Sequence, residues 1–243
     1  MQKVSGGLLL SLPAILSVLS VIIFPLFFSL VMSFYDIDIV NRKTVFIGLN
    51  NYITILKDPL FFHSLKLTTF YVVFTLSIGI LLGLGYALLL NEKFFGRKIL
   101  RTFVILPWAI PTVVAGMTWR WILDINYGAL DGLLNELGLL SGHIVYFKPG
   151  IQSLITLGTI QVWRDASLAG IIFLASLQAI PIELYEASLI DGANSFQRFM
   201  RITLPFLKPA VLVCMVLLTA NAFIQYDLVY MLTSGGPGND TTI

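Results

Sequence analysis

The chain has 243 residues, of which 57% are hydrophobic and only 12% are charged. Soluble domains carry about 25% charged residues, so this chain has about half the charge that would cover a soluble globule. The composition predicts a membrane protein and excludes intrinsic disorder, a disulfide scaffold and a coiled coil. The net charge of +2 and the lack of a basic block exclude nucleic acid as an expected partner.

Charge-free intervals predict five membrane spans in an all-α polytopic protein. The spans are expected at about 8–34, 67–91, 100–120, 151–178 and 207–230. Each is near or above the roughly 20 residues that a helix needs to cross the hydrocarbon core. The first interval is longer than the apolar region of a signal peptide, so this helix is expected to be retained. We expect residues 1–243 to form a single transmembrane domain.

Two features inside these spans carry structural predictions. Arg164 and Asp165 interrupt the fourth span, and we interpret them as an internal ion pair that faces protein or water. In the second span Gly79, Gly83 and Ala87 recur every four residues. This stripe of small residues predicts close approach of another helix.

Lys and Arg are unevenly distributed between the connections. With the N-terminus inside, the cytoplasmic connections hold 8 Lys and Arg in 44 residues, whereas the outer connections hold 6 in 72. The positive-inside rule therefore predicts a cytoplasmic N-terminus in the cell membrane. Five spans would then place the C-terminus outside.

The segment 181–204 is amphipathic rather than membrane-spanning. Its apolar stripe consists of Ile182, Tyr185, Leu189, Ala193, Phe196 and Met200, at spacings of three and four. Gly192 permits a bend between two short helices. The predicted orientation puts these helices in the cytoplasm, where we expect them to contact a partner.

The same segment resembles the cytoplasmic signature of permease subunits from binding-protein-dependent ABC importers. That signature reads Glu-Ala-Ala, three residues, Gly, nine residues, Ile-x-Leu-Pro. The matching residues here are Glu186-Ala187-Ser188, Gly192 and Ile202-Thr203-Leu204-Pro205. Every spacing is kept, and the one departure is Ser188 in place of the second Ala.

Further stretches are similar to the sugar-permease branch of that family, which includes permeases for maltose, trehalose and glycerol 3-phosphate. They are Phe46-Ile47-Gly48-Leu49-Asn50-Asn51-Tyr52, Leu106-Pro107-Trp108-Ala109-Ile110-Pro111, Trp119-Arg120-Trp121, Tyr127-Gly128 and Thr233-Ser234-Gly235-Gly236-Pro237. The resemblance implies the transmembrane domain of a type I ABC importer. Members of this family usually have a sixth span beyond this point, so we expect that a sixth span is missing by truncation.

The resemblance also implies the partners. They are a second permease subunit, two copies of a cytoplasmic ATPase subunit and an extracytoplasmic solute-binding protein that delivers a sugar. ATP and Mg²⁺ would bind the ATPase, and this chain would bind no cofactor. Residues implied to couple to the ATPase are Glu186, Ala187, Ser188, Asp191, Gly192, Ala193, Ile202, Leu204 and Pro205.

Polar and aromatic side chains within the spans are candidates for a substrate pathway, because such groups are costly in a membrane unless they serve a purpose. The candidates are Trp119, Gln161, Trp163, Asn221, Gln225, Tyr226 and Asp227. Asn221 and Gln225 are four residues apart, which predicts a shared helix face. For each candidate, packing between helices or a place in an interfacial aromatic belt is an equal alternative.

Other functional classes fit the sequence less well. A secondary transporter or channel would have no reason to carry the cytoplasmic signature. A membrane enzyme is disfavoured because the chain has no Walker lysine motif, nucleophile elbow or zinc-binding His pair. We therefore predict no catalytic and no metal-binding residue. Glycerol 3-phosphate or another small polar solute remains the alternative substrate.

Overall fold

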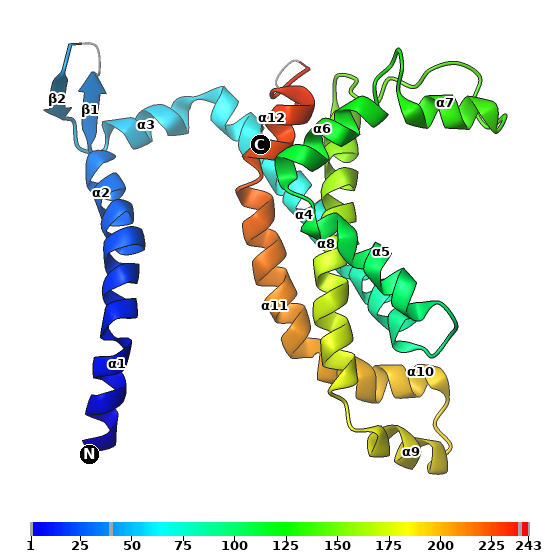
Figure 1. Cartoon of the computed structure of the whole chain (residues 1–243). Coiled ribbons are helices and arrows are strands. Elements are labelled where there is room, and N and C mark those ends of the chain that lie inside the picture. The colour runs from blue at the N-terminus through cyan, green and yellow to red at the C-terminus, as the bar shows by residue number, and fades with distance from the viewer. Residues whose placement is uncertain (1, 39–40, 238–239, 243) are drawn as a thin grey trace. The chain divides into compact units, whose positions relative to one another are not determined.

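Helices dominate the computed structural model, which describes residues 2–38, 41–237 and 240–242 (Figure 1). The chain divides into two compact units, Met1–Phe62 and His63–Ile243. The single transmembrane domain predicted over 1–243 stays a prediction.

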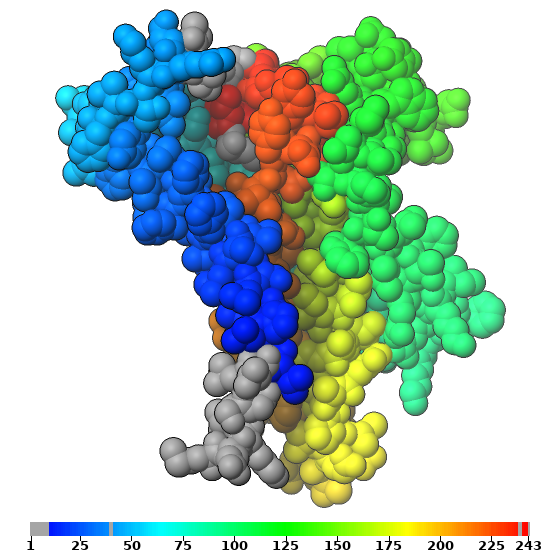
Figure 2. All heavy atoms as spheres, turned by 60° about the vertical axis from the view of Figure 1, so that its left-hand side comes forward, coloured from blue at the N-terminus to red at the C-terminus, as the bar shows by residue number. Residues whose placement is uncertain are grey.

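The first unit begins with a long apolar helix. Its consecutive parts are α1 (Gln2–Val18), the π-helical turn η1 (Leu19–Ile23) and α2 (Phe24–Met32). Within this helix, residues 10–32 form a candidate membrane span in which no residue is buried. Figure 2 shows their side chains at the surface, in dark blue.

A hairpin and a short helix complete the first unit. Strands β1 (Tyr35–Asp38) and β2 (Lys43–Phe46) pair antiparallel, with Tyr35 opposite Phe46, and α3 (Asn50–Lys57) follows. This two-stranded hairpin is a small addition to an otherwise helical chain. Asn51 fastens α3 to the end of α2 because its side-chain amide donates to the carbonyls of Ser33 and Tyr35. Asn51 belongs to the stretch 46–52 that is similar to the sugar permeases, so this stretch has a structural role.

The second unit contains the remaining helices. They are α4 (Pro59–Asn91, which starts in the first unit), α5 (Arg97–Ala109), α6 (Thr112–Ile122), α7 (Ala129–Glu136), α8 (Ile151–Gln178), α9 (Ile182–Ile190), α10 (Ser195–Arg198), the π-helical η2 (Phe199–Thr203), α11 (Leu204–Phe223) and α12 (Tyr226–Thr233). Four apolar helical stretches in the described chain are long enough to cross a membrane, and there are five if the bent pair α5–α6 is one broken span.

The core lies between α4, α8 and α11. Buried side chains from all three helices form one cluster, with Phe173 of α8 and Cys214 of α11 completely inaccessible. The predicted small-residue stripe is confirmed as a packing surface. A Cβ atom added at Gly83 would lie 2.5 Å from the Cβ of Ala169, and one at Gly79 would lie 3.6 Å from the Cβ of Asp165. Helices α4 and α8 can approach this closely because glycine has no side chain.

The segment 100–120, expected as one span, is built as two helices. Helices α5 and α6 meet at 101° with Ile110 and Pro111 between them. Proline has no backbone N–H and pushes the residue before it out of the helical region. Ile110 is accordingly extended, at φ −77° and ψ 129°.

The predicted span 207–230 is interrupted as well. Helix α11 ends at Phe223, and α12 begins at Tyr226 after Ile224 and Gln225, which are not helical. Helices α6 and α12 pack against each other beside this break. A Cβ on Gly116 of α6 would lie 2.9 Å from the Cβ of Met231 of α12, and Arg120 donates to the Met231 carbonyl.

Candidate functional site

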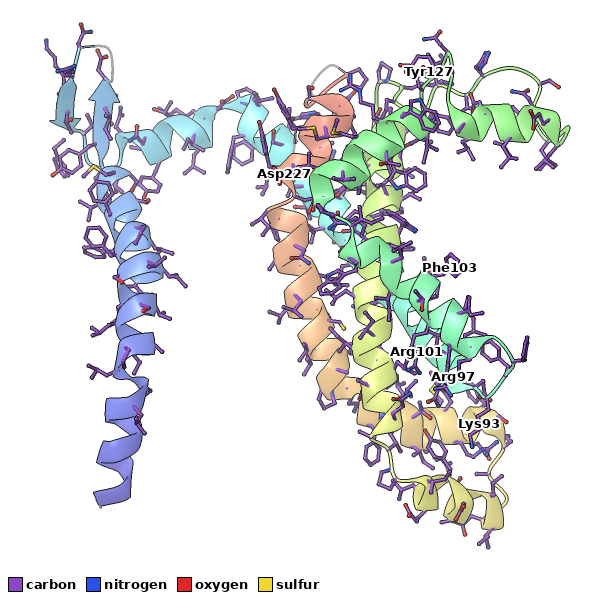
Figure 3. The ribbon with its side chains drawn as sticks, viewed as in Figure 1. Lys93, Arg97, Arg101, Phe103, Tyr127 and Asp227 are labelled. Carbon is purple, nitrogen blue, oxygen red and sulfur yellow. The ribbon has the colours of Figure 1, made fainter. Side chains whose placement is uncertain are left out.

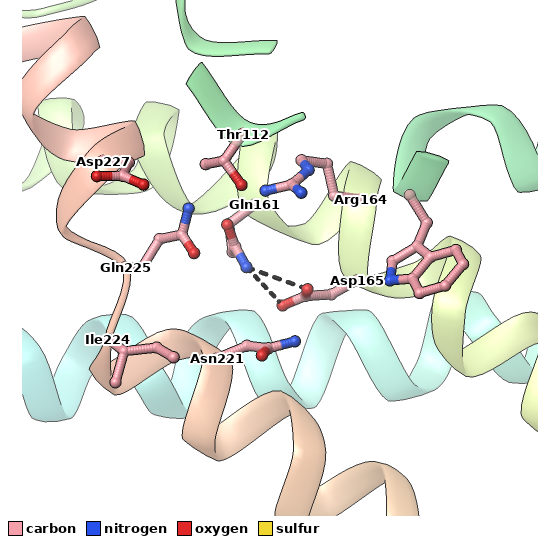
Figure 4. Close-up of a pocket in the computed structure, with 9 residues that line it drawn as sticks. Thr112, Gln161, Arg164, Asp165, Asn221, Ile224, Gln225 and Asp227 are labelled. Carbon is pink, nitrogen blue, oxygen red and sulfur yellow. Dashed lines mark hydrogen bonds between the residues drawn. The ribbon is translucent and has the colours of Figure 1, made fainter. Parts of the chain in front are cut away.

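A polar pocket of about 300 Å³ lies in the second unit, where the two helix breaks meet the middle of α8. Its lining residues are Trp108, Thr112, Gln161, Arg164, Asp165, Asn221, Ile224, Gln225 and Asp227 (Figure 4). We call this the polar pocket. Figure 3 places Asp227 at the start of α12, next to the end of α11.

At both breaks, backbone carbonyl groups lack the hydrogen bonds that they would make inside a continuous helix. The Ile110 carbonyl is 3.4 Å from Nη2 of Arg164, and the Ile224 carbonyl accepts from the Tyr226 N–H at 2.9 Å. Irregular backbone is tolerated within a membrane only where it is buried in protein or lines a water-filled cavity. The coincidence of both breaks with one pocket therefore indicates a hydrated, functional cavity.

Gln161 and Asp165 form the fixed polar centre of the pocket. The Gln161 side-chain nitrogen donates to both carboxylate oxygens of Asp165 at 3.0 Å, and the two side chains are 1% and 4% exposed. This arrangement corrects the predicted ion pair of Arg164 with Asp165. Adjacent residues on a helix point in different directions, whereas residues four apart share a face.

Within the part of the chain that the structure describes, three buried polar atoms of the pocket have no protein partner. They are Oε1 of Gln161, Nε of Arg164 and Nε2 of Gln225. Buried polar groups are normally hydrogen-bonded, so such a cluster indicates a bound solute or water. The pocket thus offers one free acceptor and two free donors within a small volume. This combination matches hydroxyl groups, which both donate and accept.

The segment 181–204 forms a separate feature at one end of the second unit (Figure 1). Helix α9 ends at a turn in which Gly192 has φ +74°, so the predicted bend is confirmed. Asn194 and Gln197 then form a reciprocal capping box that starts α10. Helix α10 continues through η2 into α11, so the signature segment is joined directly to a helix that lines the polar pocket.

The surface of this segment is unusually apolar. Side chains 55–88% exposed include Ile182, Leu189, Ile190 and Phe196, while Glu186 and Ala187 are also exposed. Within the predicted apolar stripe, Tyr185 is the member that packs against the core, and its hydroxyl bonds that of Thr203 at 2.9 Å. An exposed apolar face of this kind is typical of a docking surface for another protein.

Comparisons with known proteins agree with this architecture. Residues 76–243 match the family described as binding-protein-dependent transport system inner membrane component. The chain belongs to this family. It is therefore a membrane permease subunit of an ABC importer.

Relatives of the permease cover nearly all of its length. It is 38% identical over 97% of its chain to the trehalose/maltose transport system permease protein MalF of Thermococcus litoralis, covering 79% of that protein. It is 34% identical over 97% of its chain to the sulfoquinovosyl glycerol permease SmoG of Agrobacterium fabrum, covering 76% of it. A crystal structure of a bacterial ABC transporter that imports alginate has the same fold, with a TM-score of 0.80 at 23% identity, covering 99% of the permease and 82% of that chain.

The predicted pathway residues of the permease fall into three groups. Gln161, Asn221, Gln225 and Asp227 line the polar pocket together. The predicted shared helix face of Asn221 and Gln225 is wrong, because α11 ends at Phe223, between the two residues. Both side chains nevertheless reach the polar pocket. Tyr226 does not line the polar pocket. Its side chain is 67% exposed, and its ring stacks on that of Tyr230 with the ring centroids 5.4 Å apart.

Trp119 and Trp163 line a second, apolar pocket of about 450 Å³. Their rings meet edge to face with centroids 5.5 Å apart. The remaining lining residues are Leu123, Leu130, Tyr146, Ile155, Thr156, Thr159 and Ile160. The two tryptophans therefore lie away from the polar centre of the permease.

Sequence reasoning missed five lining residues of the polar pocket: Trp108, Thr112, Arg164, Asp165 and Ile224. A usable signal existed for the charged pair, because ionisable residues inside a span mark functional sites by default. The two prolines at 107 and 111 signalled a broken helix, which brings Trp108 and Thr112 to the pocket.

Proposed function

We propose that the permease imports a sugar or oligosaccharide through the polar pocket. The observation that supports this most is the set of unpartnered atoms on Gln161, Arg164 and Gln225, which together suit a polyhydroxyl solute. The name of one relative points the same way, since it specifies the neutral sugars trehalose and maltose. A volume of about 300 Å³ is at the lower end for ligand pockets and suits one or two sugar rings.

Charge argues against glycerol 3-phosphate, the alternative substrate. Two carboxylates, Asp165 and Asp227, line the polar pocket against one guanidinium, that of Arg164. A phosphate would meet more negative than positive charge there, so a neutral sugar is favoured.

The remaining parts of the proposal concern the partners. An extracytoplasmic binding protein would deliver the sugar to this chain and a second permease subunit. Two cytoplasmic ATPase subunits would hydrolyse ATP with Mg²⁺, and this chain would hold neither. A related solved structure is of an alginate ABC transporter in complex with a periplasmic protein that carries an alginate pentasaccharide.

Helix α9 is the proposed contact with the ATPase. Its exposed apolar residues and Glu186 would sit in a groove of the partner. The bias of Lys and Arg predicts a cytoplasmic position for this end and so supports the contact. Because α10 runs on into α11, a displacement of the signature segment would be transmitted to Asn221 at the polar pocket. Movement of the ATPase during ATP hydrolysis would in this way change the position of α11 at the polar pocket.

The substrate is tested with the assembled transporter in proteoliposomes. Uptake of a panel of labelled disaccharides and of glycerol 3-phosphate would be compared between wild type and Gln161→Ala. We expect ATP-dependent uptake of at least one sugar, with a raised half-saturating concentration in the variant. Preferred uptake of glycerol 3-phosphate, unaffected by Gln161→Ala, would contradict the proposal.

A further inference from the structure

Helix α7 buries its polar side against the loop that follows it. The carboxylate of Asp131, which is 2% exposed, accepts from the Ile144 N–H at 2.9 Å and from the Tyr146 hydroxyl at 2.6 Å. Asn135, one turn later, donates to the Gly142 carbonyl at 2.8 Å and accepts from the Gly142 N–H at 3.1 Å. The polar side of the helix is therefore not available to water.

The opposite side of α7 carries exposed leucines. Leu133 and Leu137 are four positions apart, so they share a face, and they are 54% and 62% exposed. At 3.6 residues per turn, Leu133 points about 160° away from Asp131. Glu136 lies at the border of this face, from which its exposed carboxylate can reach water. A helix that faces water shows the reverse pattern, so the exposed face of α7 calls for an apolar environment.

Helix α7 lies at the level where membrane-crossing helices end. The bent pair α5–α6 ends at Ile122, shortly before α7, and the candidate span α8 starts at Ile151, shortly after it. Trp121 and Tyr127, at the same level, are 57% and 66% exposed, and Figure 3 shows Tyr127 at the end of the second unit where α7 lies. Exposed Trp and Tyr are typical of the membrane–water interface. In the predicted orientation this interface is the outer one.

The direction of the leucine face follows from the position of the loop. In Figure 1 α7 runs across the direction of α8, and the loop that follows α7 passes back above it, on the side away from the spans. Asp131 and Asn135 bind this loop, so Leu133 and Leu137 on the opposite side of the helix face the membrane. A binding protein would approach from the side that the loop covers.

The apolar pocket extends the leucine face toward α8. Leu130 lies about 60° from Leu133 around the helix. It lines the apolar pocket together with Trp119, Trp163 and Ile155, and Ile155 is itself 39% exposed. The apolar surface at this end of the permease thus runs without a charged residue from the leucine face of α7 into the pocket.

We propose that α7 is an interfacial helix that rests on the acyl chains of outer-leaflet phospholipids, with Leu133 and Leu137 inserted among them. Interfacial helices place their apolar side at the boundary between headgroups and acyl chains. The polar side of α7 is bound by the loop, which leaves the helix free to lie on the membrane without an unpaired carboxylate below it. This role does not depend on which solute the permease imports.

The test is fluorescence quenching in the assembled transporter, reconstituted in phosphatidylcholine vesicles with or without brominated acyl chains. An environment-sensitive dye is attached to Leu133→Cys or Leu137→Cys after Cys214 has been replaced. Ser141→Cys, exposed in the loop after α7, is the matched control. We expect brominated chains to quench the dye at positions 133 and 137 at least about twofold, and to leave the dye at position 141 nearly unchanged. Iodide in the water should have the opposite order of effects.

A second measurement needs no dye. Amide hydrogen exchange of residues 129–137 in vesicles should be about tenfold faster in L133Q/L137Q than in wild type, because the helix loses its hold on the membrane. Quenching by brominated chains at 133 and 137 no greater than at 141 would overturn the proposal. So would protection of positions 133 and 137 by added binding protein in place of lipid, or equal exchange in L133Q/L137Q and wild type.

Discussion

The side-chain amide of Gln161 donates to both carboxylate oxygens of Asp165, one turn later on α8, at 3.0 Å each. The carboxylate therefore fixes the orientation of the amide and leaves Oε1 of Gln161 as a free, buried acceptor. In Figure 4 this oxygen points toward the side chain of Gln225, whose Nε2 is also free. Asp165 thus acts as a positioning residue for the acceptor of the polar pocket.

This relationship predicts the effect of Asp165→Ala. Without the carboxylate the Gln161 amide can rotate, so the half-saturating sugar concentration for uptake should rise about tenfold. Asp165→Asn keeps one acceptor for the amide and should have a smaller effect. Gln178→Ala, an exposed change on the same helix, is the control. Unchanged uptake kinetics in Asp165→Ala, at normal thermal stability, would refute the positioning role.

The contact of α4 with α8 predicts a pair of opposite outcomes for two glycines. Gly83→Ala places a Cβ 2.5 Å from Ala169, so it should lower the thermal midpoint by forcing the helices apart, at a cost of about 1–3 kcal/mol. Gly85→Ala meets nothing within 4 Å and should be neutral or slightly stabilising. Thermal unfolding of both variants in detergent measures this difference. Equal midpoints would show that the helices do not meet at Gly83.

The loop after α7 predicts a dependence on pH. The Tyr146 hydroxyl and the Ile144 N–H both donate to the Asp131 carboxylate, and these hydrogen bonds lower the pKa of Asp131. Burial and the hydrogen bond to Asp131 raise the pKa of Tyr146 to about 12. A lowered folded-state pKa stabilises the fold above the ordinary Asp value, and this stabilisation is lost as pH falls through the lowered pKa.

Asp131→Asn should therefore loosen the loop at pH 7 and matter progressively less in acid. Amide hydrogen exchange of residues 129–147 at several pH values would show the difference between variant and wild type shrinking below about pH 4. A difference that stays constant with pH would mean that the charge of Asp131 does not hold the loop.

The proposed orientation predicts which surface external reagents reach. Ile190→Cys, at a position 88% exposed at the end of α9, should resist an impermeant thiol reagent added to intact cells once Cys214 is replaced. Glu136→Cys, at the end of α7, should react and serves as the positive control. Labelling of position 190 from outside would show that the predicted orientation is wrong, and α9 could then not contact a cytoplasmic ATPase.

The long helices were predictable because an apolar interval without charge has few other folds in a membrane. The break at Pro111 carried a local signal, since proline ends the helix before it. The break at Ile224 and Gln225 carried none, because neither residue disfavours a helix in the way that proline does. It is set by packing of α12 on α6 at Gly116, a contact between residues more than 100 positions apart. For the same reason the sequence could not show that Arg164 contacts Ile110 rather than Asp165.

The most direct test of the account is ATP-dependent sugar uptake by the assembled transporter with Glu186→Lys in this chain. The charge reversal lies on an exposed site of α9, so insertion and folding should be normal while uptake falls to background and the ATPase co-purifies weakly. Glu136→Lys, the same change at the end of α7, should transport like wild type. Wild-type uptake by Glu186→Lys at normal expression, or uptake that needs no ATP, would contradict the account.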